Sequence, residues 1–286
     1  MLLYNQQAVE VARVGIERLD DQVAEARARF RLGQATRTDA QLEAQRATVV
    51  ANLADAEGAL AIAGAAYRAA VGQNAGILSA EIAPPAVLPT DREDARNAAQ
   101  AGNPVLLEQR RVVDASTARI DQARAERTPL LDFAATYGRG GRIGYDGLRG
   151  YEAAASAGVA FRRPLLTGGL VPSHIRQAEA INRAGRFQAD AALREAVRGA
   201  DAAWASLVAA QNRLQANIEG LAAADLALKG VRAEYGFGLR TTIDILVADQ
   251  SYRGAQLAVA AARADMLVAQ AALLRATGRL SPLAYG

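Results

Sequence analysis

The sequence predicts a mainly α fold of long antiparallel helical hairpins, of the α-barrel or coiled-coil type, interrupted by one pair of β-strands. The first supporting observation is composition: 51% of the 286 residues are hydrophobic but only 5% are aromatic, and the abundant alanine favours closely packed helices. The second is that apolar residues recur at three- and four-residue steps over long segments. The third is that residues 128–164 instead alternate apolar and polar positions.

The N-terminal part of the chain contains two predicted helices. Apolar residues recur with the helical period over residues 7–30. After a break at residues 31–35, Thr36 or Thr38 can cap a second helix, which continues to about Tyr67 and ends at the glycine-containing segment 72–76. A first helical hairpin is therefore expected over residues 1–72.

Residues 73–127 are predicted to be a connector followed by a helix. Three prolines lie within residues 83–89, and Thr90 and Glu93 are predicted to form a capping box that opens a short helix. Asn103 and Pro104 then open a helix that reaches about Glu126, because proline is favoured at the first helical position.

Residues 128–164 are predicted to form a β-hairpin. The apolar face of the first strand carries Leu131, Phe133, Ala135 and Tyr137, and that of the second carries Tyr151, Ala153, Ala155, Ala157, Val159 and Phe161. The opposite faces carry polar side chains such as Asp132, Thr136, Glu152 and Ser156. The glycine-rich residues 138–150 are predicted to be a loop, longer than a tight turn requires.

A second, longer helical hairpin is expected over residues 165–286. Residues 173–234 contain no proline, and a helix of some 60 residues would be roughly 90 Å long. A final helix is predicted from Thr242 to about Ala276, ended by Gly278 and Pro282. Trp204, which lies among alanines, is expected to pack at a helix interface rather than to bind a ligand.

The breaks between the helices of the two hairpins resemble each other. Both carry an aromatic residue, then glycine, threonine and aspartate at three-residue steps: Phe30, Gly33, Thr36 and Asp39 in the first, Tyr235, Gly238, Thr241 and Asp244 in the second. The glycine can end the incoming helix with a positive φ, and the threonine can cap the outgoing helix. One copy would be ordinary helix-turn-helix chemistry, but two copies indicate an internal repeat with two hairpin tips.

Several function classes are disfavoured by composition. The net charge of +3 is spread along the chain and no nucleic-acid-binding motif is present, so nucleic acid is not an expected partner. His174 is the only histidine and there is no cysteine, so no metal site is expected, and His174 is expected to have a capping or surface role. No nucleophile elbow or cofactor fingerprint is present, so neither enzymatic activity nor a cofactor is expected.

Membrane signals in the sequence are weak. No run of about 18 consecutive apolar residues occurs, so no transmembrane helix is predicted. The first residues lack the basic region of a signal peptide and become polar after Tyr4.

The two tips, with residues 164–169, 175–180 and 240–246, resemble the TolC family of outer-membrane efflux and type I secretion channels. The resemblance implies that three protomers combine their strands into one transmembrane β-barrel, to which this chain contributes two strands, and their helices into a tunnel through the periplasm. Implied partners are two further copies of the chain, a periplasmic adaptor (membrane fusion) protein, an inner-membrane RND or ABC transporter, and outer-membrane lipid. The implied location is the outer membrane, extending into the periplasm.

The resemblance also implies a gate at the hairpin tips, closed like an iris by contacts between neighbouring hairpins. The matching gate residues are Gly33, Thr36, Thr38, Asp39, Tyr235, Gly238, Arg240, Thr241 and Asp244. Tyr235 and Arg240 are expected to reach the first tip, and Asp244 is expected to line the constriction, with a first-turn helix-dipole role as its alternative. A second carboxylate that many members carry is replaced by Val247.

Compared with the family pattern, the chain is expected to be truncated at its N-terminus, because a strand pair, most of one helix and a secretion signal would precede the first tip. The remaining alternative is a soluble coiled-coil scaffold without transport activity. That alternative predicts no lipid-facing strands and extraction without detergent.

Overall fold

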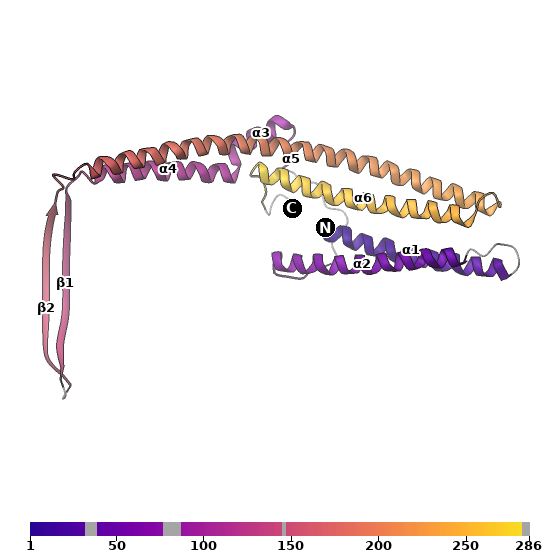
Figure 1. Cartoon of the computed structure of the whole chain (residues 1–286), viewed down its shortest axis with the longest axis horizontal. Helices are drawn as coiled ribbons and strands as arrows, with labels where there is room; N and C mark the ends of the chain where they lie inside the picture. Colours follow the sequence, from indigo (N-terminus) through magenta and orange to yellow (C-terminus); the bar gives the residue numbers. More distant parts are fainter. Residues whose placement is uncertain (32–38, 77–86, 145–146, 282–286) are drawn as a thin grey trace. The chain divides into compact units, whose positions relative to one another are not determined.

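The structure is a computed structural model that describes residues 1–31, 39–76, 87–144 and 147–281. Its elements are α1 (Leu2–Arg31), α2 (Asp39–Val71), α3 (Arg92–Gly102), α4 (Pro104–Ala125), β1 (Leu130–Gly144), β2 (Gly147–Arg162), α5 (Leu170–Gly236) and α6 (Thr242–Ala276). Residues 1–101 with 198–286 form one compact unit, residues 102–197 form another, and the 67-residue α5 contributes to both (Figure 1). The predicted mainly α fold with one strand pair is confirmed.

The larger unit contains two antiparallel helical hairpins. In the first, Arg13 of α1 contacts Glu57 of α2 at 2.9 Å, and nearer the turn Arg27 contacts Glu43. In the second, Arg213 of α5 lies 3.0 Å from Asp265 of α6. Figure 1 shows α1 running beside α2 and α5 beside α6.

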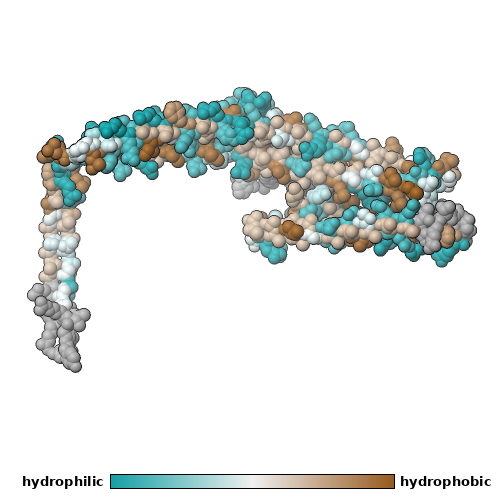
Figure 2. Space-filling model, viewed as in Figure 1, coloured by the Kyte–Doolittle hydropathy of each residue, from teal (hydrophilic) through white to brown (hydrophobic). Residues whose placement is uncertain are grey.

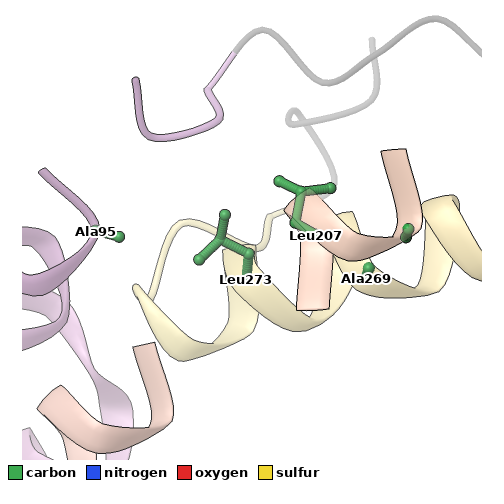
Figure 3. Close-up of a cluster of buried hydrophobic side chains, with 5 residues drawn as sticks. Ala95, Leu207, Ala269 and Leu273 are labelled. Atoms are coloured by element: carbon green, nitrogen blue, oxygen red, sulfur yellow. The ribbon is translucent and has the colours of Figure 1, made fainter. Parts of the chain in front are cut away.

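Two hydrophobic clusters hold the larger unit together. One joins α3, α5 and α6 and consists of Ala95, Leu207, Ala210, Ala269 and Leu273, with Trp204 packed against it (Figure 3). The other joins α1 and α2 through Leu19, Val23, Leu42 and Val49, and Leu246 of α6 packs against it. Small alanines let the helices approach closely, and the predicted packing role of Trp204 is confirmed.

The smaller unit pairs α4 with the first part of α5. Asn103 caps α4 by accepting hydrogen bonds from the backbone N–H groups of Val105 and Leu106, at 3.0 and 3.2 Å, with Pro104 at the first helical position, as predicted. Buried Asn182 of α5 donates to Ser116 Oγ at 2.8 Å and to Thr117 Oγ1 at 3.0 Å. These bonds satisfy a buried amide and so set the register of the two helices.

The strands β1 and β2 pair antiparallel, and their register joins the two predicted apolar faces. Leu131 lies opposite Phe161, Phe133 opposite Val159 and Tyr137 opposite Ala155. Residues directly opposite in a sheet point to the same side, so these side chains share one face. Figure 2 shows few strongly hydrophilic residues on the visible face of this hairpin.

The predicted loop at residues 138–150 is wrong. Strand β1 continues to Gly144 and β2 begins at Gly147, with Gly138 opposite Ala154 and Gly140 opposite Glu152. Glycine weakens a strand but does not prevent an extended backbone, and pairing with the partner strand decides the conformation here.

The helix start at α3 differs by one residue from the prediction. Asp91 Oδ1, rather than the Thr90 side chain, accepts the hydrogen bond from the N–H of Asp94 at 2.7 Å, and Asp94 Oδ2 accepts from the N–H of Thr90 at 3.2 Å. Aspartate and threonine are both good N-caps. In the folded chain Asp91 is the N-cap of α3, and Asp94 accepts the bond from the backbone N–H of Thr90.

Two helices are long and apolar enough, by length and composition, to cross a membrane: residues 40–71 of α2 and Thr242–Ala276 of α6. This differs from the expectation of no such helix, because alanine raises the average hydropathy without any long run of apolar residues. Asp55 and Glu57 lie within α2, and Arg263 and Asp265 within α6. Charged residues inside a bilayer are costly, and the apolar window of α6 is partly buried by protein whereas that of α2 is almost wholly exposed.

Candidate functional site

The second hairpin tip follows α5, whose end is set by Gly238, two residues after the last helical residue. Gly238 has a φ of 76°, a conformation that costs other residues about 1–2 kcal/mol. The Gly238 N–H donates to the carbonyl of Tyr235 at 2.9 Å, and the Leu239 N–H donates to the carbonyl of Glu234 at 3.0 Å. This pair of bonds is a Schellman motif, so the tip glycine ends the incoming helix as predicted.

The outgoing helix α6 begins with a capping box. Thr241 Oγ1 accepts a hydrogen bond from the N–H of Asp244 at 3.3 Å, and Asp244 Oδ2 accepts from the N–H and from the Oγ1 of Thr241, both at 2.8 Å. The backbone bond from Thr241, then its hydroxyl, lowers the pKa of Asp244, with a smaller contribution from Arg240. Asp244 is therefore ionised at neutral pH and oriented by its own helix start.

The other predicted residues of this tip lie around that cap. Arg240 Nε donates a hydrogen bond to Glu234 Oε2 at 2.6 Å, and this bond raises the pKa of Arg240. Tyr235 occupies the last turn of α5. Phe237 and Leu239, at the outer end of the tip, are 83% and 74% exposed, which leaves apolar side chains facing away from the protomer.

The first hairpin tip lies largely outside the described residues. Gly33, Thr36 and Thr38 fall in the gap at residues 32–38, and the backbone of Asp39 begins α2. The expectation that Tyr235 and Arg240 reach this tip stays a prediction.

A buried ion cluster behind the second tip was missed by sequence reasoning. Asp249 of α6 is fully buried, and its carboxylate lies 2.9 Å from Arg253 Nε of the same helix, 3.6 Å from Arg232 Nη2 of α5 and 3.8 Å from Arg18 Nη1 of α1. The i, i+4 spacing of Asp249 and Arg253 was a visible signal. The arginines from α1 and α5 had none, because they come from distant parts of the chain.

The exposed β-hairpin forms a second candidate site. Phe133, Val159 and Phe161 on its apolar face are 73%, 66% and 69% exposed. On the other face Thr136 Oγ1 and Ser156 Oγ share a hydrogen bond of 2.6 Å. An exposed sheet with one apolar and one polar face suits a boundary between lipid and water.

The described residues offer no metal site. They contain no group of three or more His, Cys, Asp or Glu side chains placed to hold an ion. His174 lies at the surface near the start of α5, with Nδ1 2.9 Å from Glu126 Oε2.

Comparisons with known proteins agree on one family. A family model described as "Outer membrane efflux protein" matches residues 95–279. The outer membrane efflux protein BepC of Brucella suis is 34% identical over 267 residues, covering 92% of this chain and 58% of its own length. Outer membrane protein TolC of Escherichia coli is 27% identical over 207 residues, covering 67% of this chain and 42% of its own.

Solved structures share the fold. VceC from Vibrio cholerae has a TM-score of 0.71 at 24% identity, covering 97% of this chain and 67% of that one. The open-state MtrE channel of Neisseria gonorrhoeae has a TM-score of 0.74 at 19% identity, covering 97% of this chain and 63% of that one. The chain thus spans about half of the length of the curated relatives it matches.

Proposed function

The chain belongs to the outer membrane efflux protein family, whose members lie in the outer membrane, and we propose that it is a subunit of a trimeric export channel through the outer membrane and periplasm. It would work in a tripartite efflux or type I secretion system, with a periplasmic adaptor and an RND or ABC transporter in the inner membrane. The observation that carries the proposal is the β-hairpin, whose register gathers exposed apolar side chains on one face.

A two-stranded hairpin of this kind requires partner strands. Both strands of the hairpin are edges, and unpaired backbone groups are costly in a bilayer. Strands from further copies of the chain would satisfy them, with Phe133 and Val159 toward lipid and Thr136 and Ser156 toward a watery lumen. This requirement supports obligate assembly with further copies of the chain, which in the proposed channel form a homotrimer.

The helical tips are proposed to form the periplasmic gate. The weak exposed pairs expected there contribute about 0–1 kcal/mol each, which suits a gate that a partner must open. Asp244 stays ionised through its capping box, so three copies would place three negative charges near one axis and attract cations. The capping role observed for Asp244 and the lining role are compatible, because only one of its oxygens, Oδ2, accepts the capping bonds.

The channel assignment also favours a non-enzymatic protein. Transport through such a tunnel needs a pore, a gate and partners, and none of these requires a catalytic residue. Selection of the exported cargo would rest with the inner-membrane pump.

The membrane part of the proposal is tested with a matched pair of charge insertions. Phe133→Asp places a charge on the apolar face of β1, and Ala134→Asp places the same charge on the opposite face, one residue away. We expect Phe133→Asp to abolish the heat-resistant trimer in outer-membrane fractions and Ala134→Asp to retain it, because a charge at a lipid-facing strand position is destabilising, by up to about 2–4 kcal/mol for basic side chains and by less for acidic ones. A soluble monomer or dimer from the parent chain, or equal effects of the two variants, would support the scaffold alternative instead.

The gate part is tested by Asp244→Asn in planar bilayers. Asparagine keeps a carbonyl oxygen that can accept the capping bonds from Thr241 while removing the charge. Cation selectivity should fall relative to the parent, whereas Asp265→Asn, an exposed change further along α6, should leave it unaltered. Unchanged cation selectivity in Asp244→Asn would refute the proposal that Asp244 lines the constriction.

A further inference from the structure

A single buried carboxylate brings together three helices of the larger unit. Asp249 is fully buried on α6, and arginines from α1, α5 and α6 surround it within 4 Å: Arg18, Arg232 and Arg253. Neither oxygen of Asp249 accepts a hydrogen bond from a described residue. Charge attraction, not a directional bond, therefore holds this cluster.

The cluster has space because α1 carries a glycine where it faces α6. A Cβ placed on Gly15 would lie 2.8 Å from Arg253 Nη1 and 3.2 Å from its Cδ, closer than non-bonded atoms normally approach. The side chain of Arg253 is only 10% exposed. The guanidinium thus fits against the backbone of the opposite hairpin.

The arginine that α1 contributes, Arg18, contacts α6 in a second way. The guanidinium of Arg18 lies 6.0 Å from the centre of the Tyr252 ring, within the range of a cation–π interaction. Arg18 therefore contacts both the carboxylate of Asp249 and the ring of Tyr252 on α6.

Apolar packing between the hairpins is incomplete beside this cluster. A cavity of about 450 Å³ lies among α1, α2 and α6, and its lining includes Ala12, Asn52, Arg253 and Leu257. Leu246 supplies apolar contact on the tip side of the cluster. Together with this apolar contact, the ion cluster joins the two hairpins beside the open space.

We propose that Asp249 is a positioning residue that locks the α1–α2 hairpin to the α5–α6 hairpin within one protomer. Without its negative charge, three positive side chains from three helices remain around a buried position, and their repulsion separates the hairpins. If the chain forms the proposed gated channel, which this consequence requires, the lock opposes the hairpin movement that opens the tips. It differs from the gate residues because it acts inside a protomer and not between neighbours.

The test measures the distance between the hairpins directly. The chain contains no cysteine, so cysteines introduced at the exposed positions Glu17 of α1 and Ser251 of α6 carry the only spin labels. The labelled chain is mixed with excess unlabelled chain, so that pulsed electron resonance reports the distance within one protomer. Asp249→Asn should shift the distribution to longer distances and broaden it, while Asp265→Asn, whose carboxylate is half exposed, should match the parent.

Two further variants keep the test decisive. Asp249→Asn combined with Arg253→Gln removes one uncompensated cation and should return the distances toward those of the parent. Arg18→Gln removes only the α1 cation and should give a smaller shift in the same direction. If Asp249→Asn does not fold, Arg18→Gln decides, and parent-like distances in the folded variant overturn the lock.

Bilayer conductance separates the lock from the channel. We expect Asp249→Asn to raise the closed-state current several-fold. If Asp249→Asn lengthens the distances but neither the parent nor any variant conducts current, the lock is supported and the proposed channel function is refuted. Longer distances with a parent-like current would refute the gating consequence.

Discussion

Replacing Gly15 with alanine should destabilise the protein, although alanine normally stabilises a helix interior. The new Cβ would lie 2.8 Å from Arg253 Nη1 and 3.2 Å from its Cδ, so the guanidinium must move by roughly 1 Å to reach ordinary contact distance. Arg253 Nε lies 2.9 Å from the buried Asp249, and lengthening that separation by about 1 Å costs about 1.5 kcal/mol at an effective dielectric constant near 20. Overpacking adds about 1–3 kcal/mol, and the helix propensity of alanine returns about 1 kcal/mol.

The net expectation for Gly15→Ala is a loss of about 2 kcal/mol, or a Tm lower by roughly 3 °C for a chain of this size. Thermal unfolding followed by circular dichroism at 222 nm measures it in the purified protein. Gly58→Ala is the matched control, because Gly58 lies inside α2 and a Cβ added there would meet no atom within 4 Å, so its Tm should rise by roughly 2 °C. A Tm that rises equally in both variants would refute the close approach at Gly15.

Two other predictions concern the tip and an exposed ion pair. Gly238→Ala should destabilise the second tip by about 1–2 kcal/mol because of the positive φ of Gly238, whereas Gly199→Ala in α5 should be neutral or stabilising. Urea unfolding compares the stabilities of the two variants, and similar effects would contradict the Schellman assignment. Hydrogen bonds from Arg96 and then Arg92 hold the pKa of Asp201 well below its ordinary value, so the stability it contributes is present above an unfolded pKa of about 3.9 and is lost as pH falls further. Asp201→Asn should therefore lower Tm at pH 7 and differ less from the parent below about pH 4; a pH-independent difference would count against the ion pair.

Local capping explains why the second tip could be predicted from sequence. The Schellman bonds at Gly238 and the capping box of Thr241 and Asp244 join atoms only a few residues apart. Their geometry is set by the backbone preferences of the residues themselves. The same holds for Asn103 and Pro104 at the start of α4.

Competing local signals explain the errors. Glycines at 138–144 suggested a loop, but the partner strand supplied hydrogen bonds that extended β1 to Gly144. At α3, Thr90 and Asp91 were both competent caps, and the sequence could not rank them.

The sequence by itself determined the helices, most of their ends and the two-sided strands, because each depends on residue spacing and on groups close along the chain. The tertiary structure alone decided what surrounds Asp249. The cost of a buried charge depends on which groups pack around it, and those groups come from α1, α5 and α6. Gly15 likewise has meaning only where the guanidinium of Arg253, more than two hundred positions away, comes to lie against it.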